Sequence, residues 1–198
     1  MTHETPQEKG QRLIDELNKS YQSCDAALCL QLINDGAALN AQGKYGGTAL
    51  IWAAYNSSID ITHALLDKGA AIDTQDQYGN TALIQAAREG YTDIALTLIE
   101  KGAVIDTQNK NGNTPLICAA LHGHTDTALT LIENGADAGL KTKKGQTAWD
   151  LAAENGHHDL AQAIRTHHIR KTFTAAAEEG TAQKRKIIHP HQKSGLEV

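Results

Sequence analysis

The chain has 198 residues and a formal net charge of −5, with 23 Asp and Glu residues against 18 Lys and Arg residues. A nucleic-acid-binding surface needs a concentrated basic face, so this balance argues against nucleic acid as the main partner. Aromatic residues make up only 4% of the chain, and its 3 cysteines are too few for a disulfide framework. The low aromatic content favours thin, closely packed helices over a thick core. The few cysteines favour a reducing compartment.

A repeat of 33 residues runs through the sequence. The tripeptide Thr-Ala-Leu or a close variant begins at Thr48, Thr81, Thr114 and Thr147, and glycines and alanine pairs follow the same interval. A fixed period of this length indicates a stack of small units, none of which buries its hydrophobic face alone. The period predicts an all-α solenoid of about five helix-turn-helix units with degenerate ends.

The chain begins with a unit that departs from the repeat. We expect residues 1–9 to be flexible and residues 10–43 to form a degenerate N-terminal capping repeat. Apolar stripes within residues 13–17 and 27–33 predict its two helices. The polar residues Asp15, Glu16, Asn18 and Lys19 would face solvent, as expected of a unit that covers the end face of a solenoid.

Four more regular repeats are predicted, over residues 44–76, 77–109, 110–142 and 143–168. In the unit that starts at residue 77, Thr81 can cap a first helix that runs to Glu89. A second helix is predicted from about Thr92 to Lys101, because its apolar residues recur at helical spacing. Each unit is thus a turn, two helices and an extended loop.

The C-terminal segment repeats part of the last unit. Residues 173–180 resemble residues 149–156, which predicts a partial capping helix within residues 169–180. The tail, residues 181–198, contains a short basic run that we interpret as solvent-exposed instead of a nuclear import signal, and we expect it to be disordered. We expect no signal peptide and no membrane span, since no stretch approaches the ~18 apolar residues that a span needs.

The repeat resembles the ankyrin repeat. The unit that matches best reads Gly112-Asn113-Thr114-Pro115-Leu116, then Ala119-Ala120, Gly123 and Leu131-Ile132-Glu133-Asn134-Gly135-Ala136-Asp137. The resemblance covers roughly residues 44–168.

Two positions depart from the ankyrin pattern. Where that pattern has a histidine after the leucine, this chain has Ile51, Ile84, Ile117 and finally Asp150, so packing must replace the usual hydrogen bonds. Ser57 stands where a helix-ending glycine is usual, and we expect an altered turn there.

The resemblance implies a protein-binding surface made of the turn tips and the inward face of each first helix. In this chain the candidate binding residues are Lys44, Tyr45, Trp52, Tyr55, Gln77, Tyr78, Gln85, Arg88, Lys110, Asn111, Leu121 and His122. Aromatic and Arg side chains dominate the energetics of interfaces, so Trp52, Tyr55, Tyr78 and Arg88 are the predicted anchors. The alternative that Trp52 and Tyr55 are buried against the capping repeat stays open.

No catalytic or metal-binding pattern stands out. The ten histidines lack the spacing of a metal site, and Cys118 has no local base that would activate it as a nucleophile. We expect a non-catalytic, cytoplasmic monomer that has no cofactor or metal and binds another protein, not nucleic acid or a membrane. Three alternatives stay open: a regulatory or targeting subunit of an enzyme complex, a bacterial effector acting on host proteins and secreted through a C-terminal signal, and a metal or small-molecule enzyme that uses the histidines.

Overall fold

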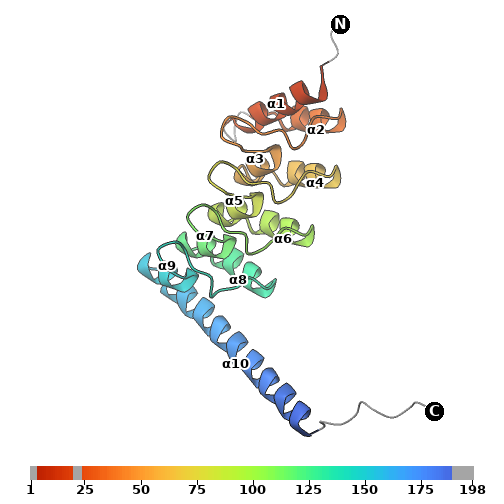
Figure 1. Cartoon of the computed structure of the whole chain (residues 1–198). Helices are drawn as coiled ribbons and strands as arrows, with labels where there is room; N and C mark the ends of the chain where they lie inside the picture. Colours follow the sequence, from red (N-terminus) through yellow and green to blue (C-terminus); the bar gives the residue numbers. More distant parts are fainter. Residues whose placement is uncertain (1–3, 20–23, 189–198) are drawn as a thin grey trace, which may run out of the picture.

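The computed structural model describes residues 4–19 and 24–188. Along these residues, ten helices form a stack of helical pairs followed by one long helix (Figure 1). The helices are α1 Pro6–Leu17, α2 Ala26–Asn34, α3 Ala49–Tyr55, α4 Ile59–Asp67, α5 Ala82–Glu89, α6 Thr92–Glu100, α7 Pro115–Leu121, α8 Thr125–Glu133, α9 Ala148–Glu154 and α10 His158–Ile188. The predicted all-α repeat solenoid is confirmed.

The first helix of each regular unit starts with the same cap. The hydroxyls of Thr48, Thr81, Thr114 and Thr147 each accept a hydrogen bond from the backbone N–H three residues later. This bond satisfies one of the N–H groups that a helix start leaves without an intrahelical partner. The four threonines are buried, so the caps also fix where the loops enter the stack.

Small side chains allow the units to pack closely. The alanine pairs of α3, α5 and α7 have no exposed surface, and α3 packs on α5, α5 on α7 and α7 on α9. The second helices form a parallel column in which α2 packs on α4, α4 on α6 and α6 on α8. The core is therefore a continuous strip between two columns of helices, without a thick centre.

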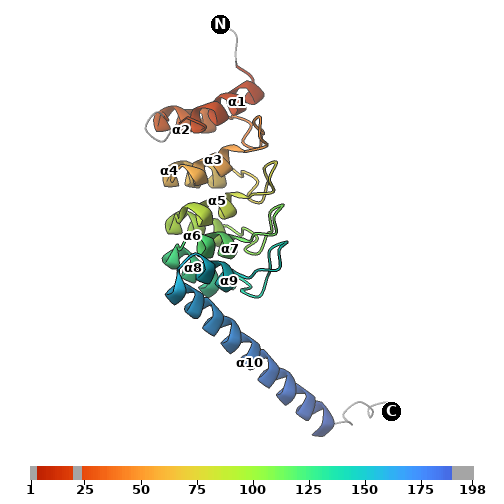
Figure 2. The same ribbon diagram turned by 90° about the vertical axis from the view of Figure 1, so that its left-hand side faces the viewer.

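The long loops between units project from one side of the stack (Figure 2). They are joined by periodic backbone hydrogen bonds of 2.9 Å, donated by Gln77 to Tyr45, by Lys110 to Tyr78 and by Lys143 to Asn111. The approach is so close that a Cβ on Gly112 would lie 2.7 Å from the Lys143 nitrogen. Each loop is therefore held in register by its neighbour.

The N-terminal prediction is wrong in one respect: the chain is helical well before Gly10. Thr5 and Glu8 form a capping box, and Pro6 takes the first helical position, which suits a residue without an N–H. The predicted flexible segment is therefore ordered from Thr5 onward, and residues 1–3 lie outside the described residues. The apolar stripe of Leu13, Ile14 and Leu17 is buried.

The C-terminal prediction is also wrong. The separate capping helix within residues 169–180 and the disordered tail from residue 181 are replaced by a single helix, α10, which runs without interruption to Ile188. Between His158 and Glu179 the sequence has neither Gly nor Pro, so nothing stops the helix. Residues 189–198 lie outside the described residues.

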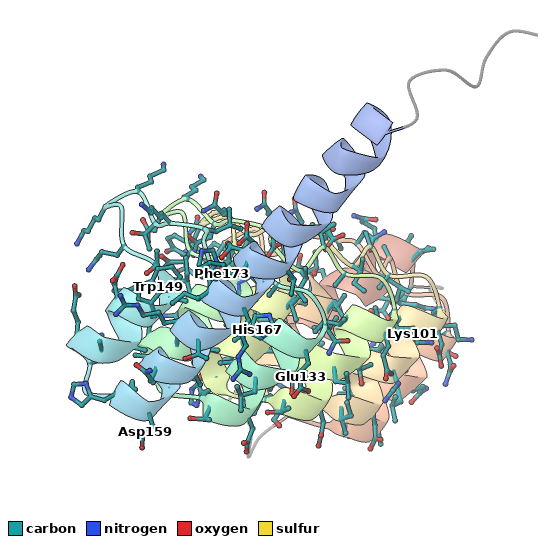
Figure 3. All side chains as sticks on the ribbon, turned by 90° about the horizontal axis from the view of Figure 1, so that it is seen from below. Lys101, Glu133, Trp149, Asp159, His167 and Phe173 are labelled. Carbon is teal, nitrogen blue, oxygen red and sulfur yellow. The ribbon has the colours of Figure 1, made fainter. Side chains whose placement is uncertain are left out.

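The beginning of α10 closes the stack. Leu160 and Ile164 are buried, and α10 packs on α8 and α9. The helix crosses the end of the solenoid and then leaves it (Figure 3), so that Phe173 is 73% exposed. The capping role predicted for residues 169–180 therefore belongs to the preceding segment.

The turn at Ser57 keeps the backbone geometry of the other units, contrary to expectation. Ser57 has φ +57°, close to the +78° of Gly90 at the corresponding position. The N–H of Ser58 donates to the carbonyl of Ala53 at 2.9 Å, as the N–H of Tyr91 does to Ala86. Only the residue at this turn differs, a serine in place of the usual glycine.

Candidate functional site

A groove runs along the first helices and the loops that face them. It consists of three adjacent hollows of about 360, 430 and 410 Å³, here called the N-terminal, middle and C-terminal hollows. Tyr78 and Arg88 line both the N-terminal and the middle hollow, while Asn111 and Leu121 line both the middle and the C-terminal hollow. Because neighbouring hollows share walls, they form one continuous surface.

Aromatic side chains dominate the N-terminal hollow. The rings of Trp52 and Tyr55 are nearly perpendicular at 89°, with centroids 5.9 Å apart, a favourable edge-to-face geometry. Trp52 is half-buried over Gly47, whereas Tyr55 is 44% exposed and Tyr78 is 59% exposed. The alternative of burial against the capping repeat thus fits Trp52 in part and does not fit Tyr55.

Gln85 supplies a buried polar atom to the same hollow. Its side chain is 9% exposed, and among the described residues its Oε1 has no hydrogen-bond partner. An unsatisfied buried acceptor is costly, and such groups are rare in folded proteins.

The middle hollow is lined by amides held in fixed positions. The Oδ1 of Asn109 accepts the backbone N–H groups of Asn111 and Asn113 at 2.9 and 3.0 Å, which shapes the loop. Its Nδ2 donates to the Oδ1 of Asn80 at 2.9 Å, so the amides of two successive units are joined. These bonds present a rigid polar wall.

Positive charge gathers beside this wall. Arg88 and His122 line the middle hollow, and the ring of His124 is bonded to the carbonyl of Arg88 at 3.0 Å. Partial burial, followed by the charges of Arg88, His124 and His157, lowers the pKa of His122, and Glu89 opposes this effect. At neutral pH His122 is therefore mostly uncharged, and Arg88 supplies the positive charge of the middle hollow.

Cys118 also lines the middle hollow but is not poised for chemistry. Burial raises the pKa of its thiol to about 12, so it stays protonated near neutral pH and is a poor nucleophile. Within the part of the chain that the structure describes, no group of three or more His, Cys, Asp or Glu side chains could hold a metal ion. The arrangement can bind through contacts and has no evident reactive centre.

Nine of the twelve predicted binding residues line the groove: Tyr45, Trp52, Tyr55, Tyr78, Gln85, Arg88, Asn111, Leu121 and His122. Lys44, Gln77 and Lys110 lie at the loop tips, outside the three hollows. Lys44 instead places its Nζ 5.5 Å from the ring centroid of Tyr45.

The prediction missed the wall formed by Asn80, Asn109 and Asn113. Their spacing offered a signal, since Asn80 and Asn113 are one period apart and each precedes a capping threonine.

A family model described as ankyrin repeats, in three copies, matches residues 20–109 and again residues 102–175. Together the two matches cover more than half of the chain, and the protein belongs to the ankyrin-repeat family. No curated protein sequence matches the chain. None of the helices in the described residues is both long enough and apolar enough to cross a membrane.

Proposed function

We propose that this protein is a non-catalytic binding module whose groove holds a segment or surface of another protein. The observation that carries the proposal is the continuous row of hollows, which combines exposed aromatic rings with fixed polar groups. Ankyrin repeats are generally protein-interaction modules, and aromatic and Arg side chains contribute most to such interfaces. Tyr55, Tyr78 and Arg88, with Trp52 behind them, are the proposed anchors.

A rigid scaffold favours this mode of binding. The loops are joined to each other by backbone bonds and the helices by the shared core, so little order has to be gained on association. We also propose that the protein is a cytoplasmic monomer. Free thiols at Cys24, Cys29 and Cys118 fit a reducing compartment.

A pull-down with tagged full-length protein from native lysate, analysed by mass spectrometry, tests the proposal. The groove variant carries Tyr55→Ser and Tyr78→Ser, because both rings are exposed and their loss should leave the fold intact. The matched control carries Val104→Ser and Leu129→Ser, which are 56% and 36% exposed and lie outside the groove.

Circular dichroism should show both variants to be as helical as the wild type. A partner kept by the control and lost by the groove variant is the expected result. Equal capture by both folded variants would contradict the use of the groove.

A further inference from the structure

The two halves of the groove differ in charge. Arg88 and His122 line the middle hollow and Lys143 and Lys144 line the C-terminal hollow, whereas no described Asp or Glu lines either. Of the three hollows, the N-terminal one alone is lined by described carboxylates, those of Asp76 and Glu89. This basic half stands out on a chain whose formal net charge is −5.

Along the part of the chain that the structure describes, the cations of this half form no ion pair with a neighbouring carboxylate. Glu154 is exposed beside the C-terminal hollow and accepts a hydrogen bond from Gln146 Nε2 at 2.7 Å. Among the described residues, Lys143, Lys144 and Arg88 take part in none of the three ion pairs, so their charges are available to a ligand.

We infer that the groove binds an extended acidic peptide segment of a partner protein; this inference rests on the proposed function. Its carboxylates lie along Arg88, His122, Lys143 and Lys144. Its other end places an apolar side chain against Tyr55 in the N-terminal hollow.

Charge complementarity and the shape of the groove both support this ligand. Opposite charges across an interface steer association and select the partner. An extended chain exposes backbone N–H and C=O groups at regular intervals, which suits a long groove lined by polar side chains. Leu121 and Leu151 add apolar surface between the cations, which suits a peptide better than a bare phosphate backbone.

The test uses a library of random 12-residue peptides displayed on phage and selected on the immobilised full-length protein. We expect the selected peptides to be enriched in Asp and Glu relative to the library. Lys143→Glu with Lys144→Glu should weaken the best synthetic peptide by about tenfold or more. The control variant carries Lys68→Glu and Arg170→Glu, which change the net charge equally at exposed sites outside the groove. Its affinity for the same peptide should change by less than about threefold.

Selection of non-acidic peptides, selection of none, or equal loss in both charge variants would overturn the inference. If Tyr55→Ser with Tyr78→Ser abolishes binding of selected peptides that are not acidic, the inference fails and the proposed function stands. If no groove variant alters binding of the peptides or of a captured protein, both the inference and the proposed function fail. Tighter, groove-dependent binding of a single-stranded oligonucleotide would overturn the choice of a protein partner.

Discussion

Ser57 holds a backbone conformation that favours glycine. Its φ is +57°, in the left-handed region, which costs a residue with a Cβ roughly 1–2 kcal/mol. Glycine removes this strain but loses more entropy on folding, about 0.5–1 kcal/mol. We predict that Ser57→Gly raises the free energy of unfolding by up to about 1 kcal/mol, measured by urea denaturation.

The reverse change at Gly90 provides the matched control. Its φ is +78°, and a Cβ there would lie 2.5 Å from Nδ1 of His124. Gly90→Ala should therefore destabilise the protein by about 1–3 kcal/mol. An unchanged or lower stability of Ser57→Gly, beside a destabilised Gly90→Ala, would show that the Ser57 turn is not strained.

His122 is the residue that should respond to pH. Because its pKa in the folded protein is lowered from 6.5, the unfolded chain binds the proton more readily. Protonation of this ring therefore favours the unfolded chain. The contribution of neutral His122 to the free energy of unfolding is present above pH 6.5 and is lost as the pH falls below it. Arg88→Gln should raise this pKa by removing a neighbouring positive charge, and an NMR titration of the histidine rings measures it.

As the pH falls, the stability of the fold should decrease, whereas the affinity for an acidic segment should increase. A bound carboxylate favours the protonated ring of His122, so affinity for an acidic peptide should rise as the pH falls from about 8 to about 6. Arg88, His124, His157 and Glu89 act on the same ring. Affinity of the His122→Gln variant should vary less over this range, and an identical pH profile would contradict the assignment.

The helices of the regular units could be predicted nearly to the residue. Thr81 and Gly90 delimit the expected first helix, and α5 covers Ala82–Glu89. The second helix was expected from about Thr92 to Lys101, and α6 covers Thr92–Glu100. The helix bounds are predictable because the capping threonines and the helix-ending glycines are local signals that recur along the repeat.

The ends of the stack were harder to predict because the repeat gives no information there. The capping box of Thr5 and Glu8 lies outside the repeat pattern, and α10 continues through its single glycine, Gly180, to Ile188. In the groove, the inward positions of Trp52 and Arg88 follow from the resemblance to the ankyrin repeat. The Asn80–Asn109 contact does not, because it joins side chains of two units through tertiary structure.

The threonine caps make the individual helix a testable element. Thr81 is 1% exposed, and its hydroxyl accepts the N–H of Ile84 at 3.3 Å. Thr81→Ala should lower the free energy of unfolding by about 1 kcal/mol, within a range of about 0.5–2, as measured by urea denaturation. Thr81→Ser keeps the hydroxyl and should lose less; an equal loss in both variants would assign the effect to the methyl group.

For the molecule as a whole, α10 has two parts with different roles. Its start carries Leu160 and Ile164 into the core, and His168 lies against Trp149 with ring centroids 5.1 Å apart. Beyond this point, Phe173 is largely exposed and the helix leaves the stack (Figures 1 and 2). The first part therefore completes the solenoid.

Truncation distinguishes these two parts. A chain shortened after Thr172 should melt within about 2 °C of the full chain, because Phe173, the first residue removed, is already largely exposed. A chain shortened before His158 loses the buried Leu160 and Ile164 and should melt markedly lower. Thermal unfolding followed by circular dichroism measures both, and a large loss from the first truncation would show that the distal helix stabilises the fold.

Photo-cross-linking from defined positions tests the central claim, partner binding in the groove, most directly. A benzophenone amino acid would replace Tyr55 in the groove or Leu129 on α8, both of which are exposed. After irradiation in cells, we expect a discrete protein adduct from position 55 and a much weaker one from position 129. Adducts formed from position 129 and absent from position 55 would contradict this claim and would place the binding surface on the opposite helices.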